Sequence, residues 1–154
     1  NMANGFEWRY NLHGGDKPLI KTFVMQDSET FTRGDVMNVE SGKVDLAVTG
    51  DTGLAGVFVG PEDPADAKEG SPGIVVGTTA VTVVKVIIND DAVYAVSDSN
   101  ARNAGATLDI TGTTGAQGVT TSSTTEFVVV ERKRQTADDT LVMLTPAAHY
   151  LAKT

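Results

Sequence analysis

Apolar and polar residues alternate along much of the chain, and glycine-containing turns interrupt the alternation. The clearest example is the segment 31–59, where the turns Gly34-Asp35, Ser41-Gly42 and Gly50-Asp51 separate short apolar runs. Turns at intervals of roughly eight residues are typical of antiparallel hairpins rather than of strand-helix-strand units. We therefore predict that this segment is a small rolled sheet, around which the rest of the chain is organised.

Further apolar runs have the length and the β-branched composition of strands. They occupy residues 18–25, 81–88, 92–96, 127–130 and 141–144. The sequence also has 16 glycines and 6% aromatic residues, a composition that favours many short strands joined by glycine turns. Capping residues and a closing glycine flank Ser99 to Ala104, so this is where we expect a short helix.

These patterns predict an all-β, mainly antiparallel fold: a small β-barrel or β-tulip-like domain with a second β lobe and at most one or two short helices. We divide the chain into an extended N-terminal arm (1–16), a first β segment (17–60), an acidic linker loop rich in proline and glycine (61–73) and a second β segment (74–154). The second segment forms a separate lobe or one compact domain with residues 17–60.

Two stretches are predicted to lie outside the main sheets. The segment 60–73 contains three of the five prolines, and proline cannot donate to a strand ladder, so we expect a loop that contributes no central strand. The stretch 111–125 is polar and rich in glycine. We expect it to be a long exposed loop or a flexible hairpin.

Three aromatic residues of the arm, Phe6, Trp8 and Tyr10, are spaced two residues apart, which places their rings on one side of an extended segment. In one interpretation the segment is an edge strand whose rings cover the domain's own core. In a second, it is an arm that docks its rings into a partner, because tryptophan and tyrosine often anchor interfaces. Ligand stacking is a third interpretation.

The sequence has one basic cluster, Arg132, Lys133 and Arg134, which follows the run 127–130. We interpret the cluster as a solvated strand end or as a contact with an acidic partner surface. Together with the three aromatic residues of the arm, it forms the set of candidate interface residues.

Charge and cysteine content exclude several classes of function. The formal net charge of −8 and a pI near 4.6 disfavour a surface that neutralises phosphates, so we expect neither nucleic acid nor membrane as a partner. The absence of cysteine removes thiol catalysis and thiolate metal sites and permits assembly in a reducing cytoplasm. The N-terminal residues lack the features of a signal peptide, and no apolar run approaches the roughly 18 residues of a membrane span.

The sequence contains no recognisable catalytic or phosphate-binding motif. His13 and His149 are its two histidines, and neither lies in a known catalytic pattern. The acidic residues of 60–73 do not match the spacing of a calcium loop, and the tripeptide 33–35, Arg-Gly-Asp, is interpreted as a hairpin turn rather than an adhesion motif. We therefore expect a protein that is not an enzyme and uses no metal or other cofactor.

The segment 23–47, F-V-M-Q-D-S-E-T-F-T-R-G-D-V-M-N-V-E-S-G-K-V-D-L-A, followed by T-G-D-T-G-L-A-G-V-F-V at 49–59, resembles the small head decoration, or cement, proteins of tailed phages. The order of parts carries the resemblance: a polar D-S-x-T-F start, a G-D-V strand, an S-G-K-V turn, an acidic G-D-T turn and a G-V end. The later segments N-D-D-A-V-Y and L-V-M-L-T-P are similar to the second half of that group.

The resemblance implies a non-enzymatic, mostly β virion protein that binds the outside of the assembled head and resists the pressure of packaged DNA. Its partners would be the major capsid protein and two further copies of itself in a homotrimer. It would be assembled in the host cytoplasm and reside on the capsid exterior. The alternative functions are a carbohydrate-binding or tail-associated β module, which needs aromatics on an exposed sheet face, and a polysaccharide hydrolase, which needs converging carboxylates.

Overall fold

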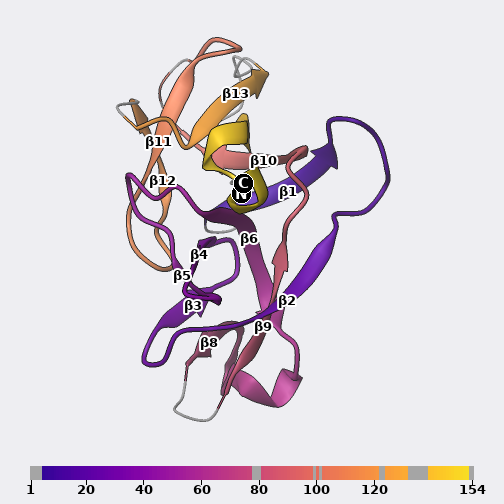
Figure 1. The fold of residues 1–154 in the computed structure, drawn as a ribbon, viewed down its shortest axis with the longest axis vertical. Helices are drawn as coiled ribbons and strands as arrows, with labels where there is room; N and C mark the ends of the chain where they lie inside the picture. Colours follow the sequence, from indigo (N-terminus) through magenta and orange to yellow (C-terminus); the bar gives the residue numbers. More distant parts are fainter. Residues whose placement is uncertain are drawn as a thin grey trace.

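The computed structural model describes residues 5–77, 81–98, 100, 102–121, 124–131 and 139–152. Strands predominate among the described residues, no described helix reaches seven residues, and the sheets are antiparallel. The prediction of an all-β, mainly antiparallel fold is therefore confirmed. The strands form two lobes that lie one above the other in Figure 1.

The upper lobe is a six-stranded sheet in the order β1-β10-β14-β13-β11-β12. Its strands are β1 (Phe6–Asn11), β10 (Ala92–Ser97), β11 (Thr107–Thr111), β12 (Gly118–Thr121), β13 (Phe127–Glu131) and β14 (Asp139–Leu144). The strand at the N-terminus thus joins the strands of the second half of the chain. β1 forms one edge of this sheet and β12 the other.

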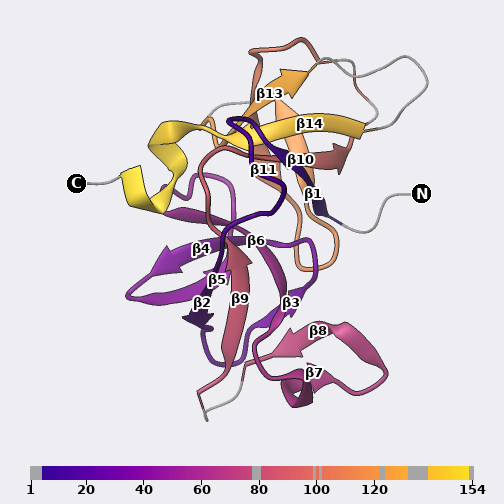
Figure 2. The same ribbon diagram turned by 90° about the vertical axis from the view of Figure 1, so that its right-hand side faces the viewer.

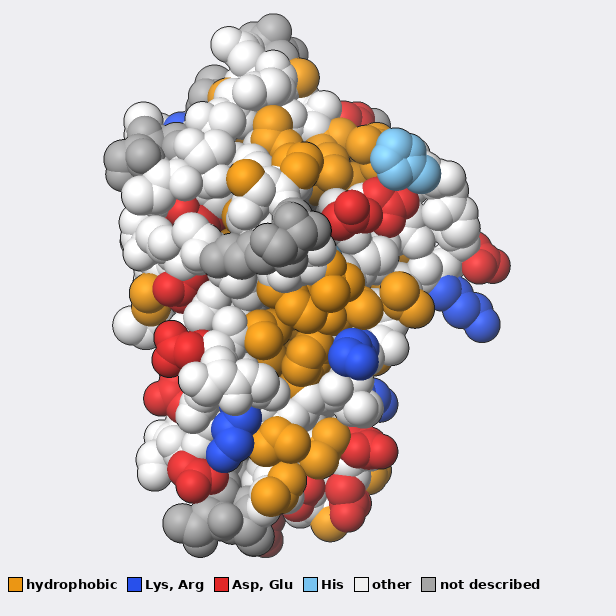
Figure 3. Space-filling view, in the orientation of Figure 1, with side chains coloured by type: hydrophobic (Ala, Val, Ile, Leu, Met, Phe, Trp, Pro, Cys, Tyr) orange, Lys and Arg blue, Asp and Glu red, His pale blue; other side chains and the backbone are white. Residues whose placement is uncertain are grey.

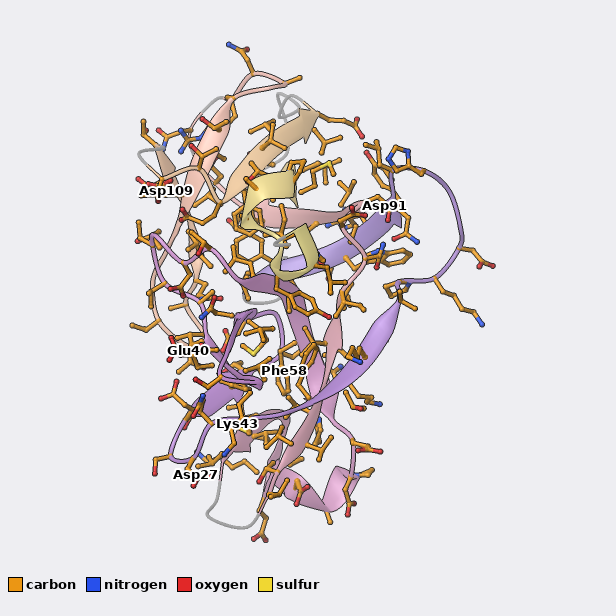
Figure 4. The ribbon with its side chains drawn as sticks, in the orientation of Figure 1. Asp27, Glu40, Lys43, Phe58, Asp91 and Asp109 are labelled. Carbon is orange, nitrogen blue, oxygen red and sulfur yellow. The ribbon has the colours of Figure 1, made fainter. Side chains whose placement is uncertain are left out.

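The lower lobe is a five-stranded sheet in the order β2-β9-β6-β4-β5. Its strands are β2 (Ile20–Val24), β4 (Val36–Glu40), β5 (Lys43–Leu46), β6 (Leu54–Pro61) and β9 (Val83–Ile87). The sheet is rolled up so that its two end strands meet. A parallel bridge between Met25, which follows β2, and Val44 of β5 marks this contact. Inside, the rings of Phe31 and Phe58 pack edge to face with centroids 5.6 Å apart, and Phe58 is labelled in Figure 4. This rolled sheet corresponds to the predicted barrel.

A small third sheet extends the lower lobe, where the sequence predicted a plain linker loop. It consists of β3 (Thr30–Thr32), β8 (Ser71–Val76) and β7 (Ala67–Lys68), with β8 in the middle. The expectation that 60–73 contributes no central strand is therefore wrong. Pro72 is tolerated because it lies at a shift in the β7–β8 register, between the pairs Lys68–Ser71 and Ala67–Val75.

Helical structure is confined to three short 3₁₀ segments, η1 (Pro64–Asp66), η2 (Pro146–Ala148) and η3 (Tyr150–Ala152), within the described residues. The helix expected at Ser99 to Ala104 does not appear in the described part of that segment, residues 100 and 102–104. The carboxylate of Asp98 accepts hydrogen bonds from the Asn100 N–H and from Arg102. The capping chemistry therefore closes a loop instead of starting a helix.

The two lobes share one hydrophobic cluster. Val36, Leu54 and Ile87 of the lower lobe pack in the same buried cluster as Tyr94 and Phe127 of the upper lobe. Figure 2 shows β1 directly above β6 at this junction. Any groove at the junction is therefore built on a packed base rather than on a flexible hinge.

Candidate interaction site at the edge of β1

The arm is a strand of its own domain for part of its length. β1 pairs antiparallel with β10, and Phe6 lies opposite Val96. The Phe6 side chain is 2% exposed and its ring stacks on Phe127, with centroids 4.9 Å apart and planes inclined by 13°. Phe6 is therefore a core residue, and almost none of its surface is exposed.

A β-bulge separates Tyr10 from the other two aromatic residues of the arm. Trp8 lies opposite Tyr94 but Tyr10 lies opposite Val93, so the register shifts at this point. Because Tyr94 and Val93 point to opposite faces of the sheet, Tyr10 points away from the face that carries Phe6 and Trp8. The prediction that the three rings share one side is wrong, since a single inserted residue reverses the alternation.

Tyr10 lies instead beside the far strand β13, where its hydroxyl donates a 2.5 Å hydrogen bond to Glu131 Oε2. Burial, the hydrogen bond to Glu131 and the negative charge of Glu131 together raise the pKa of Tyr10 to about 12. The bond joins residues 121 positions apart in the sequence. Tyr10 thus fixes the strand to its own sheet.

Trp8 is half-buried and its indole is held in one orientation by a network of side-chain amides. The indole Nε1 donates to Asn11 Oδ1 at 3.0 Å, and Asn89 Nδ2 donates to the same oxygen at 2.7 Å. Asn11 in turn donates from Nδ2 to the Lys17 carbonyl oxygen at 2.7 Å. A ring fixed in this way loses little conformational entropy when it contacts a partner.

Trp8 borders a pocket of about 190 Å³ at the junction of the lobes. The pocket is lined by Phe6, Glu7, Trp8, Arg33, Gly34, Val57, Phe58, Val59 and Ile87. Its walls are mainly apolar, and the two charged residues lie at its rim, because Glu7 and Arg33 are exposed. The open side of β1 and this pocket together form the candidate site.

The tripeptide Arg33-Gly34-Asp35 lies at one wall of the site and is a turn, but it joins β3 to β4, which lie in different sheets, and so is not the predicted hairpin turn. Gly34 has a φ of +100°, which glycine adopts without strain, and its carbonyl oxygen accepts the Phe6 N–H at 2.9 Å. Asp35 is 0% exposed and accepts the Thr32 N–H at 2.8 Å. A buried aspartate cannot reach an integrin, so an adhesive role for this tripeptide is excluded.

The Asp35 carboxylate also attaches the upper lobe to this turn. It accepts hydrogen bonds from Thr114 Oγ1 at 2.7 Å and from the Gly115 N–H at 3.0 Å. Burial raises the pKa of Asp35, and the hydrogen bonds that it accepts from Thr32, Thr114 and Gly115 oppose this effect. The tip of the β11–β12 hairpin is thus bound to the lower lobe.

Gln117 strengthens the same contact between the hairpin and the lower lobe. It is 5% exposed, accepts the Val36 N–H at 2.6 Å and donates to the Ala47 carbonyl oxygen at 2.9 Å. The stretch 111–125 does contain the predicted hairpin, and Gly112, Thr113 and Ala116 at its tip are exposed, but Thr114, Gly115 and Gln117 bind the tip to the lower lobe. The sequence does not reveal this role, because glutamine and threonine are common in loops as well as in buried polar contacts.

Neither histidine lines the candidate site. His149 is buried, with its Nε2 2.6 Å from the Ile88 carbonyl oxygen, while its Nδ1 accepts the Leu151 N–H at 3.2 Å. His13 is exposed, and its backbone N–H donates to Asp91, which is labelled in Figure 4. Within the described residues, no group of three acidic or histidine side chains is placed to hold a metal ion.

A second hollow lies on the face shown in Figure 3, where hydrophobic side chains gather between the C-terminal segment and strands β2 and β9. Its volume is about 340 Å³, and it is lined by Leu19, Ile88, Asn89, Asp90, Pro146, His149 and Leu151. Leu19 is 58% exposed and Leu151 is 60% exposed. No charged side chain other than Asp90 lines this hollow.

The remaining candidate interface residues, Arg132, Lys133 and Arg134, lie outside the described residues. None of the helices that the structure describes has the length and apolar character needed to span a bilayer. No protein-family model matches the chain, and no curated protein matches it either.

Proposed function

We propose that this chain is a structural virion protein that decorates and stabilises the outside of a tailed-phage capsid. The supporting observation is that the segments carrying the sequence resemblance form contiguous structure. Residues 23–59 include most of the rolled lower lobe, from the end of β2 to β6. The two later segments fall in β10 and β14, which pair with each other at Tyr94 and Val142.

The nature of the site favours a binding role over catalysis. Its polar groups are the main chain of an edge strand and the charged rim residues Glu7 and Arg33, around an apolar pocket. Such a site can bind a protein surface but holds no nucleophile with an adjacent base. We accordingly propose no enzymatic activity and no cofactor.

The alternative of a carbohydrate-binding or tail-associated module is less well supported. Sugar recognition by stacking needs aromatic rings on an exposed face. All the aromatic side chains of this chain are buried or half-buried, including Trp8 and Tyr10. The proposed partners are therefore the major capsid protein and, in a homotrimer, further copies of the chain, with neither nucleic acid nor membrane among them.

Binding to heads tests the proposal directly. Expanded, undecorated heads of the phage that encodes the chain are incubated with the purified protein and pelleted, and unexpanded heads serve as the control shell. We expect the protein to pellet with expanded heads in saturable amounts and to raise the temperature at which these heads rupture. Absence of saturable binding to expanded heads would refute the proposal.

A further inference from the structure

The outer side of β1 has main-chain groups that face the pocket. The Phe6 N–H bonds to Gly34 and not to β10, so the main chain of Phe6 points away from β10. Main-chain groups alternate in direction along a strand, and those of Trp8 therefore point the same way. β1 is the last strand at this end of the sheet order, so within the described residues no strand pairs with that side.

Only a short stretch of the β1 edge is open to a pairing strand. Gly34 already occupies the Phe6 N–H, and a side chain on Gly5 would lie 2.4 Å from the Gly34 oxygen. The bulge after Trp8 ends the regular register on the other side. A partner can therefore pair with β1 around Trp8 alone, while the pocket beside it accepts one apolar side chain.

The charge at the rim indicates which segment fits. Arg33 is exposed and forms no ion pair within the part of the chain that the structure describes, whereas Glu7 is paired with Arg9 at 3.0 Å. The molecule has a net charge of −8, so an uncompensated guanidinium beside an apolar pocket is unusual for this surface. Arginine binds carboxylates through charge-assisted hydrogen bonds.

We propose that the edge of β1 is a docking site for an extended peptide segment of a partner protein. The segment pairs its main chain with Trp8, places one apolar side chain in the pocket and binds Arg33 through a carboxylate. The inference rests on the proposed function in one respect, since it takes the capsid subunit as the protein that carries the segment. A short contact of this kind is weak alone and gains strength when several copies bind one shell.

The single tryptophan makes this site observable without a label, because Trp8 is the one tryptophan of the sequence. The probe is the blocked peptide acetyl-Asp-Thr-Leu-Thr-Asp-amide, titrated to millimolar concentration while tryptophan emission is recorded. Two matched probes replace leucine by alanine or both aspartates by asparagine. We expect a saturable blue shift with the first probe, and binding about tenfold weaker for the alanine probe because it buries less apolar surface.

Variants test the two recognition elements separately. Arg33→Gln removes the guanidinium charge. We expect it to weaken binding of the acidic probe by about three- to tenfold but to leave the affinity for the asparagine probe unchanged. The matched control is Lys68→Gln, an exposed lysine on β7. Val59→Lys places a charged chain in the pocket, and its melting temperature is recorded to show that it folds. If Val59→Lys does not fold, the proposal is still tested by Arg33→Gln. Its affinities for the acidic leucine probe and for the asparagine probe are then compared with those of the wild-type protein.

The inference is overturned if tryptophan emission does not respond to the probe, or if the leucine and alanine probes bind equally. It is also overturned if Arg33→Gln leaves the affinity for the acidic probe unchanged. These results are separable from the proposed function. If the wild-type protein fails to bind heads, the proposed function is wrong whatever the peptide probes show. If Arg33→Gln binds heads as well as the wild-type protein does and no probe binds, only the proposed docking site is wrong.

Discussion

Phe6 and Trp8 are two residues apart on the same face of β1, yet they have different surroundings. Phe6 is buried against Phe127, while Trp8 is half-buried at the rim of a pocket. We expect Phe6→Ala to lower the free energy of unfolding by about 3–5 kcal/mol, as large-to-small changes do in a core. Urea denaturation measures this value, and a loss below about 1 kcal/mol would contradict the core assignment.

Trp8→Ala is the matched variant for binding. Burying such a ring is worth roughly 1.5–3 kcal/mol by area, so we expect head binding to weaken by about tenfold or more. Its melting temperature should fall by less than that of Phe6→Ala, because Trp8 packs against the core with part of its surface. If binding is unchanged while the melting temperature falls by many degrees, Trp8 serves the domain's own core and not an interface.

Tyr10 gives a prediction about alkaline pH. Its pKa is raised to about 12, above the unfolded value of 10.0, so its contribution to stability is fully present below pH 10 and is lost as pH rises through about 12. We expect the urea midpoint to decrease between these pH values, and to decrease less in Tyr10→Phe. Glu131→Gln should lower the pKa of Tyr10 in difference absorbance spectra against Tyr10→Phe, and an unchanged pKa would contradict the bond.

Alternation alone could not predict how the residues of β1 are arranged. A two-residue spacing predicts a shared face, but the register shift between Trp8 and Tyr10 moves the third ring to the other face. Nothing in the residue types marks this position as a bulge. Likewise the contact of Asp35 with Gly115 joins residues 80 positions apart, and no local pattern contains it.

Among the secondary-structure elements, the positions of hairpins could be predicted from the residues of the turns. The glycine turns between 31 and 59 predicted the hairpin of β4 and β5, which pair from Met37–Leu46 to Glu40–Lys43. The prediction that the proline-rich segment contributes no central strand was wrong, because a register shift accommodates Pro72 within β8. Local propensity is therefore informative where a turn decides the structure and uninformative where tertiary pairing does.

The contact between the β11–β12 hairpin and the turn at Asp35 can be tested by substituting Asp35. Each oxygen of the Asp35 carboxylate accepts a backbone N–H, Oδ1 from Gly115 and Oδ2 from Thr32. Asp35→Asn must place an amide NH₂ against one of these donors. We expect a loss of about 1–3 kcal/mol in the free energy of unfolding at neutral pH, with the exposed Asp27→Asn as control.

The pH dependence of this variant follows from the raised pKa of Asp35. A raised folded-state pKa gives a contribution to stability that is fully present below the unfolded value of 3.8 and is lost as pH rises through the folded value. The wild-type protein should therefore gain stability relative to Asp35→Asn as pH falls through that range. Equal pH profiles in urea denaturation would show that Asp35 is not the buried carboxylate described here.

For the whole molecule, the two edges of the six-stranded sheet decide how copies can associate. β12 has the sequence Gly-Val-Thr-Thr and carries neither a charge nor a proline, the devices that usually prevent edge pairing. The net charge of −8 repels copies from one another at low salt, and physiological salt screens this repulsion between charges more than about 8 Å apart. An uncharged edge on an acidic molecule is therefore the place where copies approach with least repulsion.

We accordingly expect a homotrimer whose formation depends on salt and on β12. Sedimentation equilibrium at micromolar concentration should show trimers at physiological salt and more monomer at low salt. Thr120→Lys adds a charge to the β12 edge and should shift the equilibrium toward monomer, whereas Thr22→Lys on the exposed part of β2 should not. A wild-type protein that stays monomeric in solution and on the head would contradict the trimer, and equal behaviour of the two lysine variants would exclude β12 as its interface.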